Sequence, residues 1–107
     1  NKDIEVEYVK GKEASAVSPT NTRAFETITK LSHQIDKYNI VAPYLVMGGT
    51  DTYHYEDICD NLYRYSPFVV NTSLLLTTHS TNERCPISAL GEGVQFFKRY
   101  IKIMASE

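Results

Sequence analysis

The sequence lacks the features that several protein classes need. Cysteine occurs only twice, as Cys59 and Cys85, so the chain can form one disulfide at most and has no C-x-x-C pair. That count excludes a disulfide scaffold and favours a reducing compartment such as the cytoplasm. There is no basic block and the net charge is −2, which argues against nucleic acid as a partner. No apolar run is long enough to span a bilayer, so we expect no membrane segment in this chain.

Motifs that would identify a site by themselves are also missing. The chain has no H-E-x-x-H sequence, no internal repeat and no low-complexity segment. What it has is an ordinary globular composition: 107 residues, with 42% hydrophobic and 22% charged residues, enough for one domain. It opens without Met and directly into strand-like alternation, which is typical of a cut inside a longer protein.

Apolar residues at helical spacing predict two long helices. The first should be capped by Asn21 and end near Asn39, and the second should cover the C-terminal part of the chain. The stripe of the first helix consists of Phe25, Ile28, Leu31, Ile35 and Tyr38. The stripe of the second consists of Ile87, Leu90, Val94, Phe97, Ile101 and Met104. His33 lies off the first stripe, so we expect it at the surface.

Four further segments have strand-like patterns. Residues 4–9 alternate between apolar and acidic side chains, and residues 42–49, 62–70 and 73–79 are short apolar runs. Residues 50–61 have turn chemistry and room for one or two helical turns. This order of elements predicts an α/β fold in which helices cover a sheet. The strands after the first are apolar on both faces, so uncovered edges should recruit another copy and a homo-oligomer is expected.

His79 is the first candidate for chemistry. It follows an apolar run and is surrounded by small polar residues, with Glu83 four positions later. Imidazole and carboxylate are zinc ligands, and a strand would deliver His79 to the edge of the sheet. A hydrogen-bonded loop histidine fits the same pattern, so spacing alone leaves both interpretations open.

The sequence M-G-G-T-D is the second candidate. Two glycines after a buried strand allow positive φ angles and a close approach of a ligand to the backbone N–H groups. A tight turn with Asp51 capping the next short helix is an equally good interpretation. The nearby tyrosines are expected in the core or at its rim, and the two cysteines as small buried side chains.

Several motifs, taken together, resemble a known family. P-Y-L-V-M-G-G-T-D, S-P-F, H-S-T-N-E-R and G-V-Q-F-F occur in this order from about Ala42 to Met104. They resemble the C-terminal end of M20-family zinc metallopeptidases, in the group of Gly-Xaa carboxypeptidases, carboxypeptidase S and N-acyl-amino-acid hydrolases. Residues 1–15 resemble the end of that family's inserted lid or dimerisation domain and the crossover. Residues 16–107 then correspond to the C-terminal part of the catalytic domain.

The resemblance implies a function for the whole parent protein. Such enzymes hydrolyse a peptide or N-acyl amide bond with two zinc ions and release a C-terminal amino acid. His79 matches the last zinc ligand, with Asn82 and Glu83 as supporting residues. The remaining ligands and the general base lie upstream in the family. This chain therefore contains no catalytic residue and is expected to be inactive alone.

The same resemblance assigns the wall of the substrate site to Gly48, Gly49, Thr50 and Asp51. Two positions depart from the family pattern. Thr52-Tyr53 replaces Ser-Arg, which removes a positive charge near that wall, and Ser80 replaces a glycine after the histidine. The alternative to an enzyme fragment is a stand-alone, non-catalytic α/β binding or interaction domain.

Overall fold

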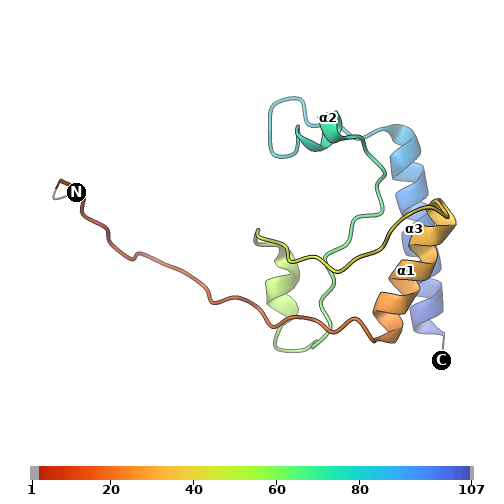
Figure 1. Cartoon of the computed structure of the whole chain (residues 1–107), viewed down its shortest axis with the longest axis horizontal. Helices are drawn as coiled ribbons and strands as arrows, with labels where there is room; N and C mark the ends of the chain where they lie inside the picture. Colours follow the sequence, from red (N-terminus) through yellow and green to blue (C-terminus); the bar gives the residue numbers. More distant parts are fainter. Residues whose placement is uncertain (1–2, 107) are drawn as a thin grey trace.

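The computed structural model describes residues 3–106, and in this part of the chain helices are the regular elements (Figure 1). They are α1 (Arg23–Ile35), the 3-10 helix η1 (Asp51–Tyr55), α2 (Thr72–Leu75) and α3 (Ile87–Ala105). The helices α1 and α3 lie side by side, while the N-terminal segment runs away from them. The radius of gyration is 17.7 Å. A compact chain of this length would have about 13 Å. Residues 1–2 and 107 of the two expected domain ranges lie outside the described residues.

The predicted α/β fold is wrong, because no residue between 3 and 106 belongs to a β-strand. A strand exists only when a neighbour accepts and donates its backbone hydrogen bonds, and an apolar pattern does not supply that neighbour. Residues 4–9 and 42–49 are irregular, and their apolar side chains are exposed, with Val6 at 89% and Met47 at 92%. Residues 62–70 also have no strand partner.

The fourth expected strand begins as a helix. The Asn71 side chain accepts a hydrogen bond from Leu74 N at 2.9 Å, which caps the N-terminus of α2. Consecutive turns then carry the chain from Leu76 to His79. A local side-chain cap therefore decides the conformation of an apolar run whose type its pattern could not settle.

The helix α1 confirms the first predicted helix, although both of its ends differ from the prediction. The N-cap is Thr22 and not Asn21, since Thr22 Oγ1 accepts from Phe25 N at 3.2 Å. The helix stops at Ile35 because Asp36 is extended, and its carboxylate accepts from Tyr38 N at 2.9 Å. Tyr38 is consequently exposed and does not continue the buried stripe.

The core lies between α1 and α3. Its buried members are Ile28, Leu31 and Phe96, and half-buried side chains pack around them: Ile35, Tyr63, Tyr100 and Ile103. Tyr65 packs on the Phe96 ring at a centroid distance of 5.1 Å. Arg23 donates to the carbonyls of Ile103 and Ser106, so α1 also satisfies the C-terminal end of α3.

The helix α3 confirms the second predicted helix, but the side that packs is not the predicted stripe. Ala89, Gly93 and Phe96 are its buried residues. Most of the predicted stripe is exposed, and we call these residues the outer face of α3: Ile87, Leu90, Val94, Phe97 and Ile101. Small residues on the packed side admit a neighbour closely, and the Phe68 ring lies against Gly93.

Candidate functional site

His79 lies at the tip of the loop that follows α2, where its backbone has an unusual conformation. Both His79 (φ 61°) and Asn82 (φ 65°) are in the left-handed region, which is uncommon for residues with a side chain. Glu83 stabilises this loop, because its Oε2 accepts a hydrogen bond from His79 N at 2.9 Å. The Glu83 carboxylate thus holds the backbone of His79, and the His79 residue itself is exposed.

The described residues do not assemble a metal centre. Between residues 3 and 106, no group of three His, Cys, Asp or Glu side chains lies close enough to hold an ion. His54 packs on the Tyr53 ring at 3.7 Å between centroids. His33 is exposed, as predicted, and bonds Asn39 O at 3.0 Å. The two cysteines are free and exposed, contrary to the expectation of buried side chains.

The glycine loop leads into η1. Neither Gly48 nor Gly49 has a positive φ, so the conformation does not require glycine at either position. Apart from the adjacent residues of the chain, no atom lies within 4 Å of where a Cβ would stand on either glycine, which leaves open space beside the loop. Thr50 is the N-cap residue of η1, but its side chain makes no capping hydrogen bond to a backbone N–H of the helix. The Thr50 hydroxyl bonds the side-chain hydroxyl of Thr52 instead, at 2.6 Å. Asp51 is the first residue of η1 and not its cap.

Sequence reasoning missed Arg64 as a partner of this loop. Its Nε donates a hydrogen bond to Thr50 Oγ1 at 3.0 Å, across 14 positions of sequence. The alternation in L-Y-R-Y could have indicated this contact, because it puts Arg64 on the side of the extended segment opposite Tyr63 and Tyr65.

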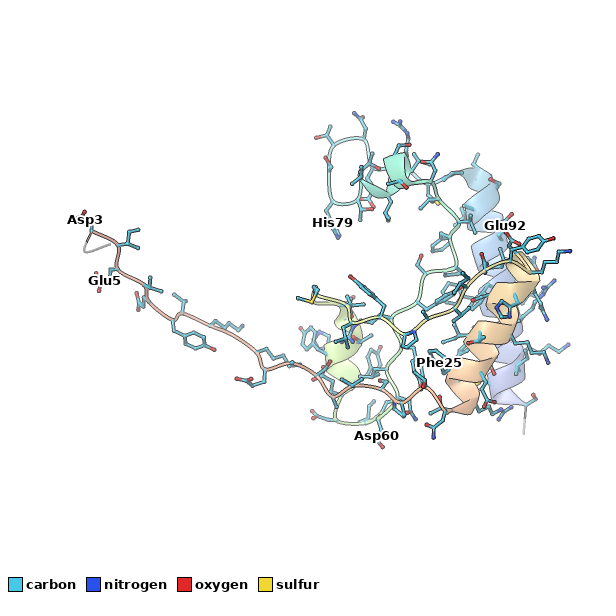
Figure 2. All side chains as sticks on the ribbon, viewed as in Figure 1. Asp3, Glu5, Phe25, Asp60, His79 and Glu92 are labelled. Carbon is cyan, nitrogen blue, oxygen red and sulfur yellow. The ribbon has the colours of Figure 1, made fainter. Side chains whose placement is uncertain are left out.

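The predicted metal ligand and the predicted substrate wall lie on separate arms of the chain (Figure 2). His79 is on the arm that carries α2, and residues 48–51 are on the arm that leads into η1. Within the part of the chain that the structure describes, no hydrogen bond joins the two. The fold therefore presents two separate groups of candidate residues.

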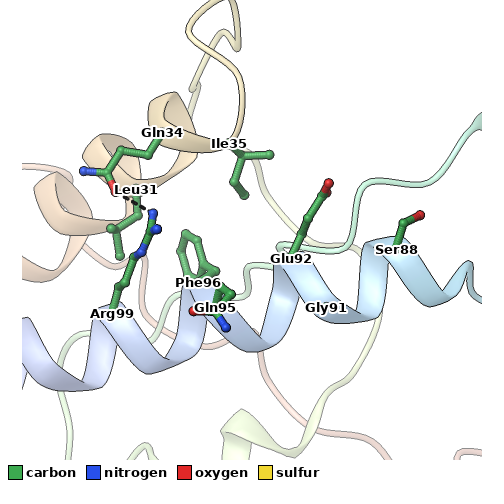
Figure 3. Close-up of a pocket in the computed structure, with 9 residues that line it drawn as sticks. All are labelled: Leu31, Gln34, Ile35, Ser88, Gly91, Glu92, Gln95, Phe96 and Arg99. Atoms are coloured by element: carbon green, nitrogen blue, oxygen red, sulfur yellow. Dashed lines mark hydrogen bonds between the residues drawn. The ribbon is translucent and has the colours of Figure 1, made fainter.

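A cavity lies elsewhere, between α1 and α3 (Figure 3). It has a volume of about 500 Å³ and is crossed by a hydrogen bond of 3.1 Å from Arg99 Nη1 to Gln34 Oε1. None of the predicted site residues lines it. A second cavity of about 230 Å³ is mainly aromatic and includes Thr52 and Tyr100. Burial raises the pKa of the Tyr100 phenol, and the charges of Tyr63 and Cys59 raise it further.

Comparison with known proteins identifies the family of the chain. The probable carboxypeptidase S-like 1 of Dictyostelium discoideum is 35% identical over 91 residues, which cover 83% of this chain and 19% of that protein. The N-fatty-acyl-amino acid synthase/hydrolase of Mus musculus is 26% identical over 105 residues, covering 92% and 20%. Carboxypeptidase S of Saccharomyces cerevisiae is 33% identical over 57 residues, covering 53% and 10%. No protein-family model matches the chain, and no solved structure matches it.

These relatives confirm the resemblance seen in the motifs. The chain is a homologue of M20-family hydrolases of the carboxypeptidase S and N-acyl-amino-acid hydrolase type. It spans about a fifth of the length of the Dictyostelium and mouse relatives. None of the helices within residues 3–106 combines the length and the apolar character needed to cross a membrane.

Proposed function

We propose that this chain is the C-terminal part of a di-zinc metallopeptidase or amidohydrolase. The parent would hydrolyse a peptide or N-acyl amide bond and release a C-terminal amino acid. The observation that supports this proposal is similarity over 83–92% of the chain to a carboxypeptidase S-like protein and to an N-fatty-acyl-amino acid synthase/hydrolase. In this proposal residues 1–15 end the lid domain and residues 16–107 belong to the catalytic domain.

The described residues fit zinc only in part. His79 offers one exposed imidazole on a loop that Glu83 stabilises. No group of three potential ligands occurs between residues 3 and 106. A catalytic zinc needs about three protein ligands, so the others would have to come from the rest of the parent. When bound, such a metal polarises a carbonyl and activates water. The 107-residue chain by itself is therefore proposed to be inactive.

The role of this chain in the parent would be to position groups. Glu83 holds the His79 backbone in its left-handed conformation, which sets the direction in which the imidazole leaves the loop. Asn82 provides the second left-handed residue of the same turn. At the other arm, the open backbone of Gly48 and Gly49, together with Thr50 and Asp51, would form the wall beside the substrate.

The decisive experiment is carried out in the longer protein that contains this chain. We expect His79→Ala to lose bound zinc and most of the activity, because it removes a metal ligand. Glu83→Gln should cost less, about 10- to 100-fold, since it acts through the loop. His33→Ala is the matched control and should leave both zinc content and rate unchanged.

The same assay distinguishes an enzyme from the alternative, a non-catalytic binding or interaction domain. Zinc content is measured by atomic absorption, and rates are measured on dipeptides and N-acyl amino acids. Full zinc content and a near-normal rate in His79→Ala would refute the metal assignment. A parent protein that turns over none of these substrates would favour a non-catalytic binding or interaction domain. Turnover by the isolated 107-residue chain that disappears with His79→Ala would contradict its proposed inactivity.

A further inference from the structure

We infer that Arg64 binds the free carboxylate of the substrate, the group at the end of the amino acid that is released. This inference rests on the proposed function and adds to it a residue that determines substrate class. The side chain is half-buried, and its Nε reaches Thr50 in the loop that is the proposed substrate wall.

The direction of Arg64 follows from the two tyrosines beside it. In an extended segment, successive side chains point to opposite sides. Tyr63 donates to Pro19 O at 2.6 Å, and its ring packs with Phe25 at 5.7 Å between centroids. The Tyr65 hydroxyl bonds Ser32 Oγ at 2.7 Å. Because both tyrosines are tied to the region of α1, Arg64 between them is directed to the other side, where Thr50 lies.

The guanidinium of Arg64 has unused donors. Its hydrogen bond to Thr50 occupies Nε, and among residues 3–106 neither Nη1 nor Nη2 has a hydrogen-bond partner or a carboxylate in ion-pair distance. A planar guanidinium presents paired N–H groups that match the two oxygens of a carboxylate. Thr50 fixes the orientation of that plane without neutralising its charge, so the group stays available for an anionic ligand.

Another cation reaches the same region, but a carboxylate already neutralises it. Lys12 Nζ pairs with Glu56 Oε2 at 2.9 Å and lies 4.5 Å from the centroid of the Tyr53 ring. Arg64 is thus the cation that contacts this loop without an anionic partner in the described residues. The open space beside Gly48 and Gly49 leaves room for a ligand there.

The test compares acids with their uncharged counterparts. The longer protein and its Arg64→Met and Arg64→Lys variants are assayed on a panel of N-acetyl amino acids and on the matching α-carboxamides. Loss of one charge-assisted contact should lower kcat/KM for the acids about 10- to 100-fold in Arg64→Met, mainly through KM. The carboxamides should change less than about twofold, and Arg64→Lys should lie between wild type and Arg64→Met because it keeps the charge but loses the paired donors.

Arg99→Met is the matched control, since Arg99 bonds Gln34 in the groove between α1 and α3 and does not contact the loop. The ratio of kcat/KM on an acid to kcat/KM on its carboxamide, taken within each variant, does not depend on the fraction of protein that is folded. A wild-type ratio close to one, or an equal loss on acids and amides in Arg64→Met, would overturn the inference.

Binding measured by calorimetry separates this inference from the proposed function. If the wild-type protein turns over nothing, the proposed function fails. In that case Arg64 is still supported if N-acetyl amino acids bind, their carboxamides do not, and Arg64→Met abolishes the difference. If neither ligand binds to the wild-type protein, the Arg64 inference fails as well.

Discussion

Replacing Gly93 by alanine tests how tightly the segment 62–70 is packed on α3. Alanine is preferred over glycine inside a helix by about 1 kcal/mol. At Gly93 this gain is opposed by a steric clash, because a Cβ there would lie 2.6 Å from Cδ1 of Phe68 and closer still to Cε1. Carbon atoms do not approach so closely, so the Phe68 ring must move away from Gly93 and from its edge contact with Phe97.

The size of the effect follows from these opposing terms. Overpacking costs about 1–3 kcal/mol, so Gly93→Ala should be net neutral to destabilising by about 2 kcal/mol. Gly91→Ala is the matched control in the same helix, because nothing lies within 4 Å of its added Cβ. That variant should stabilise by about 1 kcal/mol. The two substitutions, chemically identical and two residues apart, should therefore differ by about 1–3 kcal/mol.

Urea unfolding of the chain, followed by circular dichroism of the helices, measures this difference. A Phe68→Ala background provides a second test: with the ring absent, Gly93→Ala should become stabilising, as Gly91→Ala is. Equal stabilisation by Gly93→Ala and Gly91→Ala with Phe68 in place would refute this expectation. In that case Phe68 would not be held against α3 in solution.

Two further predictions concern the packed and the exposed sides of α3. Burial raises the pKa of Tyr100, so the folded state keeps this proton more tightly than the unfolded state. Its contribution to stability is complete below about pH 10 and is lost as the pH rises through the folded pKa. The urea midpoint should therefore fall at alkaline pH less steeply in Tyr100→Phe, and an equal slope in both chains would contradict the assignment. The outer face of α3 should bind an apolar dye and promote association of the chain. Val94→Glu should reduce dye binding and association and Gln95→Glu should not, whereas a monomer without dye binding would argue against this role.

The elements that the sequence determined are those whose stabilisation is local. A helix closes its hydrogen bonds within about four residues, so apolar spacing was sufficient to find α1 and α3. Local competition also explains the errors at the ends of α1: Thr22 and Asp36 supply side-chain bonds that compete with those of their neighbours. Motif order, which is a property of the sequence alone, was likewise enough to indicate the family.

Tertiary structure decided the features that depend on a partner far away in the sequence, namely strand formation and the packed side of α3. The apolar runs had the composition of strands, but a strand needs a neighbour to complete its hydrogen bonds, and none of the described segments provides one. Helical spacing identified the apolar stripe of α3, yet the packed side contains Ala89, Gly93 and Phe96, because small residues let the Phe68 ring approach.

The candidate site shows the same division. The sequence pointed to His79 and to Thr50 by residue type and spacing, but it could not show what they contact. The bond from His79 N to Glu83 and the bond from Arg64 to Thr50 depend on φ angles and on the side to which an extended segment turns. The left-handed φ angles belong to the local turn of residues 79–83, which the Glu83 side chain closes. The side taken by Arg64 is set by tertiary packing, since the tyrosines beside it bond on the side of α1 and leave Arg64 the opposite side.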